Sequence, residues 1–191
     1  MTPLAQAMAH FAHVAPISSH TRATLAPHLP PLVQELFTYG VGYIGDGLLR
    51  TVDPITIARA VVDLAAPIHA SHSFPILTTA FGDVVTEWRS RLYLINARVG
   101  RYIGLGRAGR LAQVVTELAD PQRRTFLLGR APWAEAVGRL GMPTPRECFA
   151  YVPPLSVLPR GEGEVTGIER VGLREHLEFL AAFHGPAQGR W

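Results

Sequence analysis

The sequence contains no lysine, one cysteine and few charged residues of either sign. All 18 basic side chains are arginines, and charged residues make up 17% of the 191 residues, below the roughly one quarter typical of globular proteins. The single cysteine, Cys148, excludes an internal disulfide and with it a disulfide-stabilised secreted scaffold. The arginines are spread along the chain and form no run of like charge, so the sequence gives no support to a nucleic-acid-binding arm.

Long hydrophobic stretches are also absent. No window approaches the ~18 consecutive apolar residues of a membrane-spanning helix, so we expect none. The first residues, MTPLAQAMAHFAHVAP, lack a basic segment followed by a continuous apolar core, so we do not expect a signal peptide. The expected location is the cytoplasm. With 48% hydrophobic residues, the chain can bury one good core, either as one domain or as two small packed lobes.

Helical patterns occupy the first third of the chain. Leu4, Met8 and Phe11 recur at helical spacing, so residues 1–27 are predicted to form a helical arm. Proline pairs and a terminal glycine predict a short helix in PHLPPLVQELFTYG, and Asp53 before Pro54 begins another in DPITIARAVVDLAAP.

Residues 74–106 change to a strand pattern. Four short runs rich in β-branched and aromatic residues, FPILTTA, VVTEW, RLYLIN and RYIGLG, are separated by turn residues and predict an antiparallel meander. Both alternate sets of the third run are apolar, which indicates a central strand covered by helices on both faces. Helical patterns return in residues 107–185, and residues 186–191 are expected to be a loose tail. The predicted class is α+β: an antiparallel β-meander packed against several helices, with two small lobes forming one compact unit.

Two motifs leave open an alternative, a small nucleotide- or metal-binding enzyme. GLGRAG places Gly104, Gly106 and Gly109 in the spacing of a dinucleotide fingerprint, but that fingerprint needs a βαβ unit, and the preceding runs predict a meander. His69 and His72 are close enough in sequence to share a zinc ion, although no further ligands lie nearby in sequence. A glycine-rich strand exit and a pair of loop histidines are the competing interpretations.

Two other groups of residues invite a catalytic interpretation. Cys148 with Glu147 and His176 could supply a nucleophile and a base, but the apolar neighbours of the cysteine indicate a buried thiol. In TTAFGDVVTEW, Asp83 is better explained by a turn in which Phe81 anchors the bend, Gly82 adopts an unusual backbone conformation and Asp83 accepts hydrogen bonds from turn amides. We therefore predict no catalytic residue, no cofactor and no metal ligand.

Three stretches together resemble a known family. In the same order, they are similar to segments of the immunity proteins of type VI secretion effectors that carry a GAD-like N-terminal region: LPPLVQELFTYGVGYIGDGLLRTVDP, TTAFGDVVTEWRSRLYLINARVG, and ECFAYVPPLSVLP with IERVGLREHLEFLA. The resemblance implies a GAD-like region over residues 28–106, containing the meander, and an immunity-type region over residues 107–185. The chain departs from the family pattern where Ala150 replaces the usual glycine.

The resemblance implies a noncatalytic protein that binds a cognate toxin, often a nuclease, and neutralises it in a stoichiometric complex. The matching positions are expected to be scaffold: Gly45, Asp46, Gly47, Phe81, Gly82, Asp83, Glu147, Cys148, Val152, Pro153, Glu175 and His176. We expect no membrane partner and no direct contact with nucleic acid. Residues on predicted turns are the candidate contacts with the toxin: Tyr43, Asp46, Arg89, Arg91, Glu162 and Glu164.

Overall fold

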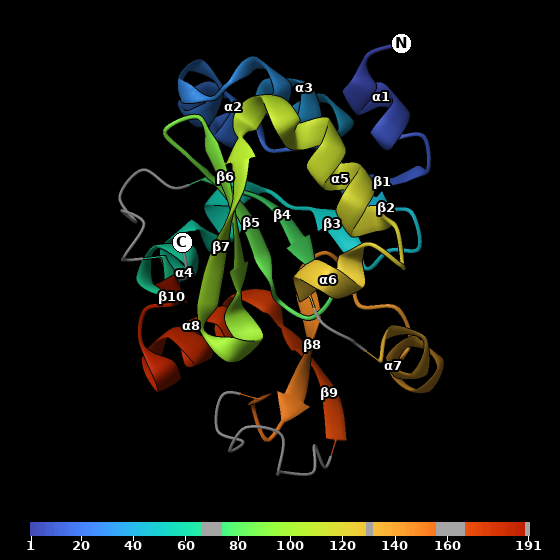
Figure 1. Ribbon diagram of the computed structural model, residues 1–191, viewed down its shortest axis with the longest axis vertical. Coiled ribbons are helices and arrows are strands. Elements are labelled where there is room, and N and C mark those ends of the chain that lie inside the picture. The colour runs from blue at the N-terminus through green and yellow to red at the C-terminus, as the bar shows by residue number, and fades with distance from the viewer. Residues whose placement is uncertain (66–73, 129–131, 156–166, 190–191) are drawn as a thin grey trace.

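The computed structural model describes residues 1–65, 74–128, 132–155 and 167–189 (Figure 1). Eight strands form one large sheet in the order β1-β2-β3-β4-β5-β6-β7-β10, and β8 pairs with β9 in a separate antiparallel sheet. The strands of the large sheet are β1 Phe11–Ala15, β2 Val41–Ile44, β3 Leu49–Thr51, β4 Phe74–Thr79, β5 Val84–Trp88, β6 Arg91–Asn96, β7 Arg101–Arg107 and β10 Gln188–Gly189. The second sheet consists of β8 Glu147–Val152 and β9 Gly167–Gly172.

Helices cover both faces of the large sheet. They are α1 Pro3–Ala7, α2 Ser19–Leu25, α3 Pro31–Tyr39, α4 Pro54–Leu64, α5 Leu111–Ala119, α6 Arg124–Leu128, α7 Trp133–Leu140 and α8 Leu173–His184. Short 3-10 turns, η4 Ala97–Val99 and η5 Ala108–Arg110, precede β7 and α5 respectively. In Figure 1, α1, α2 and α3 gather at the top of the molecule and the β8–β9 pair lies at the bottom. Within the described residues, no helix has the length and apolar character needed to cross a membrane.

The α+β class and the central position of the third meander strand are confirmed. Leu92 and Leu94 of β6 belong to the hydrophobic cluster that includes the buried face of α5. The alternate residues, Tyr93 and Ile95, belong to a second cluster that includes the buried faces of α4 and α8. Because successive side chains of a strand point to opposite faces, an all-apolar strand requires cover on both sides.

The prediction of a helical arm over residues 1–27 is wrong in part. The first helix ends at Ala7, and Phe11 belongs to β1, where it pairs with Ile44 of β2 in antiparallel register. Leu4 and Met8 are buried, so the segment packs on the body of the protein. Ladder hydrogen bonds to β2 outweigh the helical spacing of three apolar residues, which is a weak local signal.

The tail is also not loose up to residue 189. The Ala187 side chain is fully buried, and its amide donates to the Leu64 carbonyl at 2.8 Å. Gln188 donates to the Gly100 carbonyl at 2.8 Å, and β10 pairs in parallel with Arg101 and Tyr102 of β7. The division of the chain at residue 107 stays a prediction.

Candidate functional site

The stretches that carry the family resemblance meet at one end of the large sheet. Leu49 pairs with Thr79, so the β2–β3 turn lies beside the β4–β5 turn. Arg50 of β3 is completely buried and donates to the carbonyl oxygens of Thr79 at 2.7 Å, Thr144 at 2.8 Å and Glu147 at 2.7 Å. One side chain therefore joins the ends of all three stretches.

Asp83 at the β4–β5 turn forms a buried ion pair. Its carboxylate lies 3.0 Å from the Arg98 guanidinium and accepts the Thr79 hydroxyl at 3.0 Å. Burial lowers the pKa of Arg98, but the Asp83 charge and its hydrogen bond outweigh burial and leave the pKa of Arg98 raised. The side chains are 5% and 1% exposed, so the pair is closed to a substrate and acts as a structural link.

For this turn, the predicted backbone conformation of Gly82 is confirmed, but the predicted hydrogen-bond donors to the Asp83 carboxylate are wrong. Gly82 has φ +80°, and a Cβ there would approach His176 to 3.3 Å, so the position requires glycine. Phe81 is buried and stacks on Tyr151 with ring centroids 5.5 Å apart. The carboxylate of Asp83 accepts hydrogen bonds from the Arg98 guanidinium and the Thr79 hydroxyl, and not from the amides of the turn as predicted.

Cys148 and His176 both lie against Gly82 in the interior. Burial raises the pKa of the Cys148 thiol to about 12, so at neutral pH it is protonated and a weak nucleophile. Burial also lowers the pKa of His176 to about 4. These values agree with the interpretation of Cys148 as a small buried hydrophobic residue.

The GLGRAG motif does not form a dinucleotide fold. Gly104 and Gly106 lie in β7, which runs antiparallel to β6, and the helix that follows is succeeded by α6. The βαβ geometry that places a pyrophosphate on a helix N-terminus is thus missing here. His69 and His72 lie outside the described residues, and the part of the chain that is described holds no group of three metal-ligating side chains.

The opposite end of the sheet carries an exposed arginine cluster. Register pairs Trp88 of β5 with Arg91 of β6, and Arg91 with Arg107 of β7. The three side chains therefore form a row on one face across three adjacent strands, with neighbouring Cβ atoms about 5 Å apart. Arg89 lies over the Trp88 ring at 4.9 Å. We call these four side chains, Trp88, Arg89, Arg91 and Arg107, the basic patch.

The turn within the basic patch has a strained backbone. Arg89 and Ser90 have φ of 47° and 59°, as a type I′ hairpin requires, although Asn-Gly is the sequence that this turn favours. Non-glycine residues in this region cost about 1 kcal/mol or more each. The turn is held by two further bonds: the Glu87 carboxylate accepts the Ser90 amide, and the Ser90 carbonyl accepts the Ala108 amide at 2.7 Å.

Positive charge in the basic patch is not neutralised within the described chain. Arg89, Arg91 and Arg107 are exposed, and no carboxylate of the described residues forms an ion pair with them. Glu87 points to the other face, where it is 4% exposed, and burial raises its pKa. Arg110, which precedes α5, lies on that other face, against Gly106. The first turn of α5 contains no acidic residue to balance its positive dipole end.

Of the four predicted contact residues that the structure describes, two lie together in the basic patch. Arg89 and Arg91 share the basic patch, whereas Tyr43 and Asp46 lie near the other end of the sheet. The Tyr43 hydroxyl donates to the Pro143 carbonyl at 3.2 Å, and Asp46 pairs with Arg124 at 2.8 Å. Glu162 and Glu164 lie outside the described residues. Sequence reasoning missed Trp88 and Arg107, whose place in the row depends on strand register.

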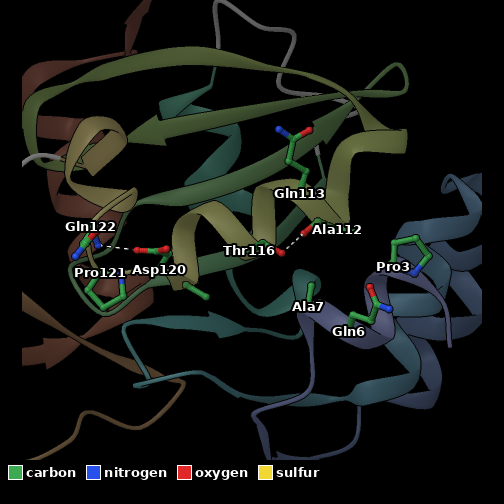
Figure 2. A pocket seen from close by; sticks show the side chains of 10 residues that line it. Pro3, Gln6, Ala7, Ala112, Gln113, Thr116, Asp120, Pro121 and Gln122 are labelled. Atoms are coloured by element: carbon green, nitrogen blue, oxygen red, sulfur yellow. Dashed lines mark hydrogen bonds between the residues drawn. The ribbon is translucent and has the colours of Figure 1, made fainter.

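A groove of about 1000 Å³ runs between α1 and α5 (Figure 2). Figure 2 shows Gln6 and Ala7 of α1 across from Ala112 and Thr116 of α5. At its far end, the Asp120 carboxylate accepts the Gln122 amide at 2.8 Å, and such backbone hydrogen bonds lower its pKa. Small and amide side chains form most of its lining, and Asp120 is the one titratable side chain among the lining residues that the structure describes.

No protein-family model and no curated protein matches the sequence. Among solved structures, the chain is similar to Atu4351 from Agrobacterium tumefaciens, with a TM-score of 0.71 and 15% sequence identity. The match covers 92% of this chain and 86% of that chain. At this identity, the similarity shows a shared fold and carries no statement about function.

Proposed function

We propose that the chain is an immunity protein, which acts without catalysis in the cytoplasm of the cell that makes it. It binds a cognate secreted toxin, a type VI secretion effector such as a nuclease, and neutralises it in a stoichiometric complex. The source of the proposal is the resemblance of three stretches of the sequence to that family.

The observation that carries the proposal is the convergence of those stretches. Arg50 bonds to carbonyl groups of the second and third stretches, and the Phe149 amide donates to the Ala80 carbonyl at 2.7 Å. Arg50, Ala80 and Phe149 are all buried, so these contacts support the role of the matching stretches as scaffold.

The basic patch is the surface that suits a protein partner best. Arginine and tryptophan are enriched among the residues that dominate binding energy at protein interfaces. A standard interface buries about 800 Å² on each partner, so a patch of this kind would be its centre and neighbouring surface its rim.

The test is co-expression with the product of the adjacent open reading frame. We expect that the neighbour alone stops growth, that this chain restores it, and that the two proteins co-purify in a fixed ratio. An unrelated toxin in the same vector is the control, and its toxicity should persist. Failure of both rescue and co-purification, with the neighbour confirmed toxic, would contradict the proposal.

A further inference from the structure

We infer that the basic patch binds an acidic segment of the partner protein, with Arg91 and Arg107 holding its carboxylates. The inference rests on the proposed function for the identity of the partner and adds the chemistry of the contact. It assigns to Arg107 a role that the sequence did not suggest.

Two unfavourable features coincide in the free protein. Arg91 lies directly opposite Arg107, and like charges at such positions destabilise a sheet. Arg89 and Ser90 occupy a strained turn, which holds the Arg89 guanidinium over the Trp88 ring. An anionic partner would relieve the repulsion between Arg91 and Arg107.

The geometry suits carboxylates. A guanidinium presents a planar fork that matches a carboxylate with two parallel hydrogen bonds. Two such forks side by side, at Arg91 and Arg107, can hold two acidic side chains or share one. Trp88, half-buried beside them and covered by Arg89, adds an apolar surface of the kind that anchors a polypeptide.

The distribution of the other arginines favours an acidic polypeptide over nucleic acid. A nucleic acid is held by basic residues that follow its backbone over many phosphates. Here most other arginines with an assigned contact serve the fold: Arg50 and Arg98 are buried, and Arg123, Arg124, Arg170 and Arg174 are ion-paired. These six arginines are therefore engaged within the fold and do not extend the basic patch, and a patch of this size fits a short acidic segment.

The decisive variant is Arg91→Glu, because it places opposite charges across the strand pair and should not weaken the fold. The matched control is Arg101→Glu, the same change at the other, exposed end of β7. Binding is measured for the neighbouring toxin, for a decaglutamate peptide and for a mixed-sequence DNA duplex, at low and high salt. Melting temperature is measured on the same samples.

We expect the melting temperature of Arg91→Glu to be at least that of the unaltered chain. We expect this variant to bind the toxin at least tenfold more weakly and to show no binding of decaglutamate. We expect Arg101→Glu to keep both within about twofold, and affinity for the toxin to fall as salt screens the contact. An unchanged toxin affinity in Arg91→Glu would overturn the inference and leave the immunity function intact. If the unaltered chain binds the DNA duplex but not decaglutamate, the inference is overturned in favour of a nucleic-acid contact. Patch-dependent binding of decaglutamate without any toxin complex would refute the immunity proposal and support an acidic partner of another kind.

Discussion

Single polar residues in the interior stabilise this fold by bonding distant parts of the chain to one another. Arg50, Asp83 and Arg98 have side chains that often do chemistry, yet each is buried and bonded to other parts of the chain. Burial lowers the pKa of Arg50 to about 10, still far above neutral pH, so the guanidinium keeps its charge and its three carbonyl partners. Removing one member of such a network leaves an unpaired buried group, which costs more than the bond itself gains.

His176 predicts how stability depends on pH. Burial lowers its pKa from the ordinary 6.5 to about 4, so the folded chain resists protonation that the unfolded chain accepts. Above pH 6.5 both states are neutral and the histidine has no effect; between 6.5 and about 4, stability falls as pH falls. At pH 5 we expect a loss of about 2 kcal/mol relative to pH 7.

The measurement is chemical denaturation from pH 7 to pH 4.5 of the unaltered chain and of His176→Gln. The difference between the two isolates the histidine from other titrating groups. Parallel curves would show that the pKa of His176 is the same in the folded and the unfolded chain, and would contradict the prediction.

For single residues, the sequence predicts those conformations and environments that depend on adjacent residues. The Phe-Gly-Asp turn follows from local backbone chemistry, and the buried state of Cys148 follows from its apolar neighbours. The partner of Asp83 does not, because Arg98 lies 15 positions away and meets it only once β5, β6 and η4 have formed. The row of Trp88, Arg91 and Arg107 is hidden for the same reason.

The β5–β6 hairpin is the element in which the needs of folding and of the proposed function differ. Replacing Arg89 and Ser90 by Asn and Gly would supply the residues that a type I′ turn favours. We expect the double variant to be more stable by about 1–2 kcal/mol, because the strained backbone is relieved, and to bind the toxin more weakly, because Arg89 is lost.

Guanidinium denaturation measures the first effect and co-purification the second. Ser90→Gly alone is the control: it should gain part of the stability and keep full binding. No stability gain in either variant would mean that contacts such as the Glu87–Ser90 hydrogen bond already compensate the turn.

Whole elements were predictable where periodicity is sustained and strand pairs are adjacent in sequence. The four runs of residues 74–106 form β4 to β7 in meander order. The first strand was missed because its partner β2 begins 26 residues beyond its own last residue, since β1 ends at Ala15 and β2 begins at Val41. Pairing at that range leaves no local pattern.

The whole molecule is a sheet between two hydrophobic clusters, and its C-terminal segment ties three of its parts together. Through backbone hydrogen bonds, residues 187–189 join α4 at Leu64, the η4 turn at Gly100 and strand β7. Ending the chain at Gly185 would remove these bonds and uncover the site of Ala187. We expect a loss of about 1–3 kcal/mol in the free energy of unfolding.

A chain ending at Gly189 is the matched control and should unfold at nearly the same denaturant concentration as the full chain. Equal stability of both shortened chains would show that β10 adds nothing to the fold. Toxin binding should survive in the control, because the basic patch lies at the opposite end of β7 from the contact with β10.

The buried polar side chains Arg50, Asp83 and Arg98 lie at the opposite end of the sheet from the basic patch, and this separation bears on how such a protein can evolve. Substitutions at the two-residue hairpin and its neighbours change the exposed surface without touching Arg50, Asp83 or Arg98. If the chain acts as proposed, a lineage that meets a new toxin can alter its specificity by a few substitutions at the hairpin, while the residues of the core change under separate constraints. Grafting the hairpin of one relative onto the body of another would transfer that inherited specificity in a single exchange.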